Sequence, residues 1–210
     1  AIKKRNNNTI IFEEVYKPIN SKPQIYNFSD KVINSSKSWR VQNYKLTKDW
    51  AEELTSIEYV IDLGCGPLTN SNLLKNFNTI FIDGAKFDNI DVVCDFAKKL
   101  PIKSESVEAI LCSNVFEHLS EPEICMKEIS RVLKKNGKAL ILIPFIIKLH
   151  QEPFDFYRYT KHALKYISKK SNLDVQEIKE IGGVSEILST LFRIYIASSN
   201  NYLFKLSLKI

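Results

Sequence analysis

The sequence lacks any hydrophobic run long enough to cross a bilayer. Its longest apolar stretch, residues 139–147, contains Pro144 and is far shorter than the roughly 20 residues that a spanning helix needs. The basic residues near the N-terminus are not followed by the apolar region of a signal peptide. We therefore expect no transmembrane helix and no secretory leader, and we expect a cytoplasmic protein.

The chain also lacks the cysteine and histidine spacings of a zinc site. Its four cysteines form no C-x-x-C pair, and no histidine lies at zinc-finger spacing from them. Three of the four lie in or beside apolar runs, which is typical of buried, reduced thiols in a reducing compartment. The sequence therefore predicts no metal site.

A basic stripe is missing too, although the net charge is +6. The lysines come as scattered pairs, at residues 98–99, 134–135 and 169–170. A nucleic-acid-binding surface would combine a basic stripe with interleaved aromatic residues. We therefore expect no nucleic-acid partner, while the charge permits an anionic substrate without requiring one.

The 210 residues have ordinary globular composition, with 44% apolar and 26% charged residues, which predicts one domain with a full core. Residues 1–38 are rich in asparagine and contain two prolines, so we interpret them as an irregular N-terminal arm that precedes a domain over 39–210. Leu46, Trp50 and Leu54 recur at helical spacing and predict a helix over 43–56.

Strand and helix patterns alternate beyond that helix. Apolar strands are predicted at residues 59–63, 79–82, 91–94, 109–112 and 139–143. Helices are predicted at 71–77 and from Pro122 to a C-cap at Asn136-Gly137. Continuous apolar strands separated by helices predict an α/β fold, a doubly wound and mostly parallel sheet with helices on both faces.

The C-terminal part leaves two interpretations open. Residues 173–178 alternate like a strand, and residues 184–210 are aliphatic and aromatic with sparse charge. They predict a helix and a last strand packed on the sheet. The alternative is an amphipathic surface that meets a lipid-linked substrate or a second subunit, with peripheral contact to a membrane.

Glycines and polar side chains follow the predicted strands, where parallel sheets bind their ligands. Asp83 lies roughly twenty residues past a glycine turn, which is where nucleotide-binding sheets place the acid that accepts from ribose hydroxyls. Asp95 is suited to accept from an adenine amino group, and Phe96 either stacks on the ring or fills the core. The candidate residues are Asp62, Gly64, Cys65, Gly66, Asp83, Gly84, Asp95, Phe96, Ser113 and Asn114.

Five stretches resemble, in order and spacing, the type-11 group of class I methyltransferases that use S-adenosylmethionine (SAM). They span residues 60–67, 82–84, 94–101, 114–119 and 128–137, and the resemblance covers residues 57–147. It implies a Rossmann-like fold with SAM as cofactor. In that likeness Gly64, Cys65 and Gly66 surround the methionine part, Asp83 holds the ribose, Asp95 and Phe96 frame the adenine, and Ser113 and Asn114 line the floor near the sulfonium.

Two departures from that family accompany the resemblance. The third glycine that the turn often has is absent, since Leu68 and Thr69 follow Pro67. Its absence also counts against a nicotinamide-dependent oxidoreductase, whose pattern is G-x-G-x-x-G. The segment between Asp83 and Val92 is short, so we expect a turn where the family has a helix.

Residues 146–162 mix aromatic side chains with His150, Asp155 and Arg158, a composition that suits a pocket wall. They resemble a segment found in a type-11 subset tied to sugar, lipid-linked glycan or natural-product pathways, which implies a place at the active-site mouth. His150 is our first candidate for a general base and Asp155 the second. Candidate substrate-binding residues are Tyr157, Arg158, Tyr159 and His118.

A structural alternative stands beside each of these roles. Asp155 and Arg158 have the charges to pair and fix the loop, and Thr160 is placed to cap a helix that begins at Lys161. His118 suits ordering a loop by hydrogen bonding better than acting as a base.

The sequence therefore predicts a SAM-dependent methyltransferase that acts, at oxygen, on a small-molecule, sugar or lipid-linked glycan acceptor. The alternative is a catalytically degenerate domain that serves as a SAM-binding or partner subunit. A methyltransferase acting on RNA nitrogen is disfavoured, because no Asn/Asp-Pro-Pro-aromatic motif follows the fourth strand. The acceptor and the oligomeric state stay open.

Overall fold

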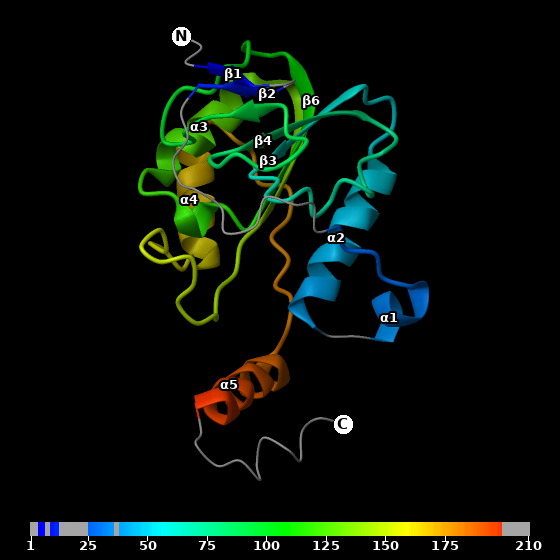
Figure 1. Cartoon of the computed structure of the whole chain (residues 1–210), viewed down its shortest axis with the longest axis vertical. Helices are drawn as coiled ribbons and strands as arrows, with labels where there is room; N and C mark the ends of the chain where they lie inside the picture. Colours follow the sequence, from blue (N-terminus) through cyan, green and yellow to red (C-terminus); the bar gives the residue numbers. More distant parts are fainter. Residues whose placement is uncertain (1–3, 7–8, 13–24, 36–37, 199–210) are drawn as a thin grey trace.

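The computed structural model describes residues 4–6, 9–12, 25–35 and 38–198, and one central sheet organises them (Figure 1). Its seven strands lie in the order β1-β2-β5-β4-β3-β6-β7. They are β1 Lys4–Asn6, β2 Thr9–Ile11, β3 Tyr59–Leu63, β4 Asn78–Asp83, β5 Val92–Val93, β6 Val107–Ser113 and β7 Leu133–Leu142.

All neighbouring strands from β2 to β7 pair in parallel, and β1 is an antiparallel edge. The chain continues from β3 to β4 on one side and reaches β6 on the other side. Such a reversal of strand order opens a crevice beyond the carboxyl ends of the central strands. The predicted doubly wound, mostly parallel sheet is confirmed.

Helices cover both faces of this sheet (Figure 1). The helices are α1 Asp30–Ser35, α2 Trp39–Glu53, α3 Pro122–Val132, α4 Lys161–Lys170 and α5 Val184–Ser198, with a short 3-10 turn η1 at Phe116–His118. The helix predicted over 43–56 corresponds to α2. Helix α2 lies on one face, while α3 and α4 lie on the other.

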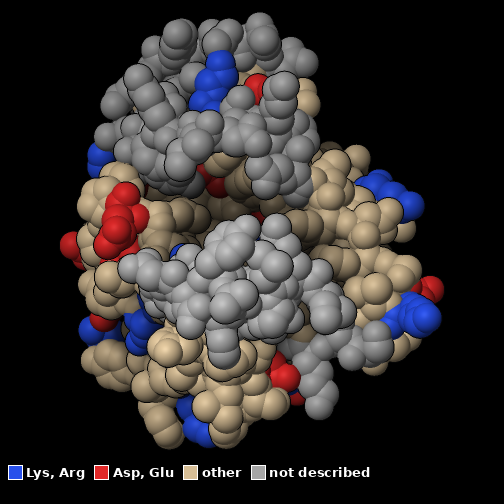
Figure 2. Space-filling model, turned by 60° about the horizontal axis from the view of Figure 1, so that its bottom comes forward, with Lys and Arg blue, Asp and Glu red and all other residues tan. Residues whose placement is uncertain are grey.

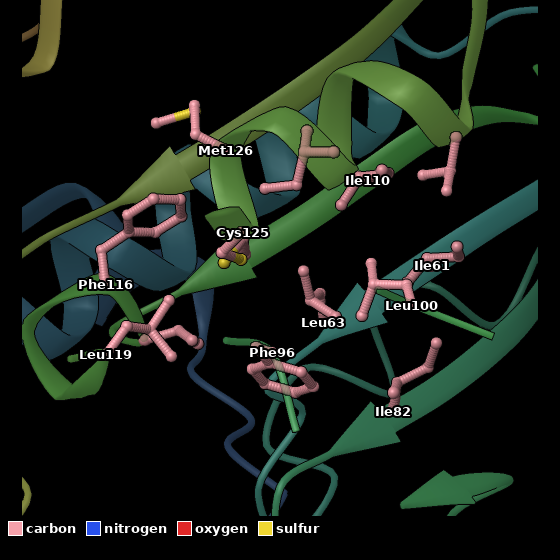
Figure 3. Close-up of a cluster of buried hydrophobic side chains, with 14 of the residues drawn as sticks. Ile61, Leu63, Ile82, Phe96, Leu100, Ile110, Phe116, Leu119, Cys125 and Met126 are labelled. Atoms are coloured by element: carbon pink, nitrogen blue, oxygen red, sulfur yellow. The ribbon is translucent and has the colours of Figure 1, made fainter. Parts of the chain in front are cut away.

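Alternating side chains of the central strands build a separate core on each face. Ile61, Leu63 and Ile110 pack with Cys125 and Ile129 of α3 (Figure 3). The residues between them, Val60, Ala109 and Leu111, pack with Ala51 and Leu54 of α2 and the chain after it. Because both faces are covered, these strands carry apolar residues on both faces and do not alternate between apolar and polar residues.

Three predicted elements differ in the structure. Residues 71–77 form successive turns instead of a helix, in a stretch where Ser and Asn side chains compete for backbone groups; the Ser71 hydroxyl, for example, donates to the Leu68 carbonyl. No strand forms at 173–178; the alternation there reflects Leu173, Val175 and Ile178, which are partly buried between exposed neighbours.

Helix α3 ends at Val132, ahead of the predicted C-cap at Asn136-Gly137. The carbonyls of Arg131 and Val132 accept hydrogen bonds from the amides of Glu105 and Ser106, so the chain leaves the helix for the sheet. Asn136, with φ 64°, then lies inside a register shift of β7 against β6.

The N-terminal arm is not wholly irregular, because β2 extends the sheet beside β5. The amides of Ile10 and Phe12 donate to the carbonyls of Asp91 and Val93, and the Thr9 hydroxyl donates to the Ile90 carbonyl at 2.7 Å. Two three-residue strands carry too little periodicity to be found in the sequence.

At the other end, α5 confirms the predicted C-terminal helix, but it lies apart from the sheet (Figure 1). The predicted last strand falls within 199–210, outside the described residues. Within the described part of the chain, no helix is long and apolar enough to cross a membrane. Contact of this segment with a membrane or a second subunit stays a prediction.

Ile129 of α3 is fully buried in the larger core cluster, whereas Ile124 on the same helix is 37% exposed. We expect Ile129→Ala to lower the free energy of unfolding by about 2–5 kcal/mol, because it removes buried contacts and leaves a cavity. Ile124→Ala, the matched control, should change it by less than about 1 kcal/mol. Urea unfolding of both variants checks this; equal losses would contradict the assignment of the core.

Candidate functional site

A cavity of about 1030 Å³ opens at the carboxyl ends of β3, β4 and β6. Its volume is at the upper end of the range for small-molecule sites. The loops after these strands, α2, and the segment after β7 all contribute to its lining. On the face shown in Figure 2, lysine and arginine side chains lie apart from one another rather than in one patch.

The loop after β3 brings bare backbone to this cavity. Gly64 and Gly66 have φ of 77° and 52°, which favours glycine. A Cβ on Gly64 would lie 2.1 Å from Cγ2 of Val115, whereas a Cβ on Gly66 would meet no atom within 4 Å. The amides of Gly64 and Cys65 both donate to the Ile82 carbonyl. The turn is thus fixed to β4 and leaves space on its cavity side.

Asp83, at the end of β4, is buried and lines the cavity. Its Oδ2 accepts from the amide of Gly66 at 2.8 Å, and its Oδ1 accepts from the amide of Ala85 at 2.9 Å. A carboxylate oxygen can accept two hydrogen bonds, so Asp83 can join these two loops and also receive hydroxyl groups from a ligand. The segment that follows, residues 84–91, contains no helix, as predicted.

The next two candidate pairs also reach the cavity lining. Asp95 accepts from the amide of Ala97 at 2.9 Å and lies 3.6 Å from the ammonium of Lys98. Phe96 is buried in the main core (Figure 3), so its side chain chiefly fills the core, the second of the two roles considered for it. Ser113 and Asn114 lie together at the end of β6, with the side-chain amide nitrogen of Asn114 donating to the Ser113 hydroxyl.

Sequence reasoning missed the contribution of α2 and of the arm before it. Trp39, Arg40, Asn43 and Tyr44 of α2 and Tyr26 of the arm line the cavity. Asn43 also donates to the side-chain oxygen of Asn114 at 3.5 Å. The four helical residues form two i, i+4 pairs, Trp39 with Asn43 and Arg40 with Tyr44, and so lie on one face of α2. This spacing was a signal for the face that lines the cavity, which the apolar positions of the helix do not indicate.

Asp62 lies behind the glycine turn and outside the cavity lining. Its side chain is fully buried, and neither carboxylate oxygen has a hydrogen-bond partner. Burial, with a smaller effect from the Asp83 charge, raises the pKa of Asp62 to about 7. Asp62 was predicted to bind the cofactor, but its side chain lies in the protein interior and does not reach the cavity.

The segment after β7 adopts the structural alternative at two positions. Arg158 donates to both oxygens of Asp155, at 2.6 and 2.9 Å, and the amide of His150 also donates to Asp155. The Arg158 guanidinium holds the pKa of Asp155 well below its usual range. The pair fixes the loop, and Thr160 caps α4 through the amide of Ala163.

The structure does not bring the other predicted substrate-binding side chains of this segment to the cavity lining. The hydroxyl of Tyr157 donates to the Ser120 carbonyl, and that of Tyr159 donates to the Phe116 carbonyl at 3.1 Å. The two tyrosines therefore tie the segment to the loop after β6, while Arg158 stays with Asp155. The segment's contribution to the lining comes instead from Ile147 and Lys148, from His150 to Glu152, and from Phe154 and Phe156.

Three polar side chains meet where these two loops join. Glu117 is completely buried, lines the cavity, and has no hydrogen-bond partner on either oxygen; burial raises its pKa to about 7. Nε2 of His118 lies 3.6 Å from Oε1 of Glu117, and the rings of His118 and His150 are 4.8 Å apart. Sequence reasoning missed Glu117, although it directly precedes a candidate histidine.

His118 orders a loop, as predicted. Its Nδ1 lies 2.6 Å from the Phe154 carbonyl, which connects the loop after β6 to the segment after β7. Burial is the main cause that lowers the pKa of His118, so the ring is neutral near pH 7. His118 also lines the cavity, which keeps the predicted contact with substrate possible.

Comparison with known proteins bears directly on this cavity. Residues 61–141 match a family model described as a methyltransferase domain. The ubiquinone biosynthesis O-methyltransferase of Pelagibacter ubique is 26% identical over 93% of this chain and 92% of its own length. An uncharacterized protein of Methanocaldococcus jannaschii is 30% identical over 57% of this chain; the chain spans about half of that relative, 52% of its length.

A likeness to solved structures concerns the fold. A SAM-dependent methyltransferase from Archaeoglobus fulgidus shares 14% identity with this chain. The superposition covers 79% of this chain and 89% of that one, with a TM-score of 0.51. The two proteins therefore share a Rossmann-like fold, and residues 61–141 of this chain contain the turn after β3, Asp83, and the loop after β6.

The buried carboxyl of Asp62 predicts a pH-dependent stability. Its pKa of about 7 in the folded chain exceeds the ordinary value of 3.8, so between these values the folded state binds a proton that the unfolded state releases. The free energy of unfolding therefore falls as pH rises through this window. We expect Asp62→Asn to be more stable than the wild type, by an amount that grows by about 2 kcal/mol or more between pH 5 and pH 8.

Thermal unfolding at the two pH values measures this difference. Asp88→Asn, at an exposed position of the loop after β4, is the control and should match the wild type at both. A difference between Asp62→Asn and the wild type that is the same at pH 5 and pH 8 would contradict the assigned cause.

Proposed function

We propose that the protein transfers a methyl group from S-adenosylmethionine (SAM) to a hydroxyl oxygen of a small-molecule acceptor, because residues 61–141 match a methyltransferase-domain model and the fold resembles that of a SAM-dependent methyltransferase. The observation that carries the proposal is the cavity wall in which the Gly66 turn, Asp83 and the Glu117–His118–His150 cluster meet.

The cavity fits the cofactor at the end near β3 and β4. The open space at Gly66 admits a ligand against the backbone, and the carboxylate of Asp83 is available to ribose hydroxyls. Asp95 and the edge of Phe96 would adjoin the adenine, and Ser113 and Asn114 would lie near the sulfonium. When bound, SAM supplies the methyl group: a C–O bond forms, the C–S bond breaks with its electrons left on sulfur, and the acceptor loses its proton.

The acceptor would occupy the other end of the cavity, beside Glu117, His118 and His150. Phe154 and Phe156 add aromatic surface there, which suits an acceptor with an apolar body or ring. The chain's own residues hold and orient the hydroxyl, and the polar cluster assists loss of its proton. Of the two candidate bases, His150 remains; Asp155 does not, because Arg158 occupies both of its oxygens.

Transfer to oxygen is supported by the Pelagibacter ubique relative, which is named as an O-methyltransferase and aligns over most of both chains. A sugar or lipid-linked glycan is the acceptor that the likeness of residues 146–162 favours, and α5 would then meet the lipid part. The alternative, a degenerate partner subunit, predicts that the cavity binds no SAM.

Cofactor binding is tested with Asp83→Asn, which keeps the side-chain shape and removes the charge. We expect calorimetry to give a micromolar Kd for SAM with the wild type and about a tenfold or greater weakening in the variant, equivalent to about 1.4 kcal/mol. Asp88→Asn, on the same loop, should bind like the wild type, and NAD should not bind. Absence of SAM binding in the folded wild type would favour the degenerate subunit instead.

Transfer to oxygen is tested with SAM that carries a deuterated methyl group, offered with panels of phenols, catechols and sugars. We expect S-adenosylhomocysteine to be released together with an alkali-stable methyl ether, and His150→Ala to lower kcat by about a hundredfold. Mass spectrometry of the product identifies the methylated atom. A methylamine product, or unchanged kcat in His150→Ala, would refute the proposed chemistry.

A further inference from the structure

We propose that Glu117, His118 and His150 form a binding site for a divalent transition metal ion such as Zn²⁺ at the acceptor end of the cavity. The inference deepens the proposed function and rests on it for the metal's role, but not for the metal's binding. It departs from the sequence expectation of no metal site, because two ligands come from adjacent residues and the third from a loop 32 positions later, a spacing that matches no zinc motif.

The ligand atoms already lie close together. One ligand atom from each residue lies within 4.8 Å of the others. At tetrahedral angles, metal bonds to histidine and carboxylate of about 2.0–2.2 Å place two ligand atoms about 3.4 Å apart. The cluster therefore has to contract by at most about 1.4 Å, which side-chain rotation of the partly exposed His150 can supply.

Both histidines are oriented as metal ligands are. Nδ1 of His118 faces the Phe154 carbonyl at 2.6 Å, and Nδ1 of His150 faces the Lys148 carbonyl at 3.2 Å and Oδ2 of Asp155 at 3.4 Å. A proton on each Nδ1 leaves Nε2 as the ligand nitrogen. Metal-binding histidines usually donate their other N–H to a carbonyl or carboxylate in this way.

The unpartnered polar atoms give the second, independent observation. Nε2 of His118 and both oxygens of Glu117 are buried without a hydrogen-bond partner, which is costly for a carboxylate unless a cation or donor meets it. Arg158, the cation whose charge acts on Glu117, already binds Asp155 through both of its terminal nitrogens. A metal ion would satisfy Nε2 of His118 and one oxygen of Glu117 at once.

The ligand set indicates which ion fits. Two imidazoles and one carboxylate suit Zn²⁺ and its transition-metal neighbours, whereas Mg²⁺ prefers oxygen ligands throughout. Three protein ligands leave an open position, as in catalytic sites, and the lining of the cavity by all three residues places that position toward an acceptor. With its Nε2 on the metal, His150 would assist proton loss through the ion and not as the base itself. A cation there would lower the pKa of a bound hydroxyl and so promote release of its proton to water near neutral pH.

The test uses the full chain after treatment with a chelator and dialysis. Zn²⁺ and Mg²⁺ are titrated separately by calorimetry, and Co²⁺ is followed by its visible absorption bands. Variants are His150→Ala and Glu117→Gln, with His162→Ala, an exposed histidine of α4, as the matched control. SAM is titrated into each protein in parallel, and circular dichroism verifies folding.

We expect the wild type and His162→Ala to bind one Zn²⁺ per chain more tightly than Mg²⁺, with Co²⁺ bands of a site of low coordination number. Both ligand variants should bind Zn²⁺ at least about tenfold more weakly while their Kd for SAM changes by less than about twofold. Should Glu117→Gln fail to fold, the loop variant His150→Ala carries the test alone.

Two results would overturn the metal site: no stoichiometric Zn²⁺ binding by the wild type, or binding that His150→Ala leaves unchanged. Either result together with SAM binding would leave the proposed methyl transfer standing. Zinc binding that depends on His150, without SAM binding, would have the opposite meaning: the metal site would stand and the proposed function would fall.

Discussion

The two hydrogen bonds that Asp83 accepts join the loops on which the rest of the site depends. One oxygen holds the amide of Gly66 and the other holds the amide of Ala85, so a single carboxylate at the end of β4 fixes the glycine turn after β3. The turn also packs closely against the loop after β6, because Val115 fills the place where a side chain on Gly64 would lie. The space between the fixed backbone of the turn and the Asp83 carboxylate is suited to a ligand with hydroxyl groups.

A second constraint acts across the cavity, in the contacts between the loop after β6 and the segment after β7. His118 reaches the Phe154 carbonyl, and the amide of Phe156 donates to the Glu117 carbonyl. The Asp155–Arg158 pair closes the same segment on itself. These bonds explain why Asp155 and Arg158 lie outside the cavity lining. The two residues fix the segment that carries His150, beside His118 and the buried Glu117.

The end of the cavity near β3 and β4 was predictable from the sequence, whereas the end near His118 and His150 was predictable only in part. Asp83, Asp95 and Asn114 follow strands whose order is fixed by parallel pairing, so position along the chain determines position in the site. The contribution of Asn43 from α2 depends on how a helix rotates against the sheet, which apolar spacing alone does not settle. Glu117 lines the cavity and Asp155, the predicted candidate base, does not. This outcome depends on which carboxylate Arg158 meets, and tertiary contacts decide it.

Asp62 and Glu117 are both buried carboxyls without hydrogen-bond partners. The cost of burying a carboxylate charge has different consequences at the two positions. Each has a pKa raised to about 7 by burial, so each is poorly solvated in its charged form. Asp62 lies behind the turn and outside the cavity lining, and its cost is a loss of stability that increases with pH. Glu117 lines the cavity beside two histidine nitrogens, so a cation can offset its cost. A fold that retains an unpaired carboxylate at a place where a cation and an acceptor hydroxyl can both reach it is arranged for binding rather than for stability alone.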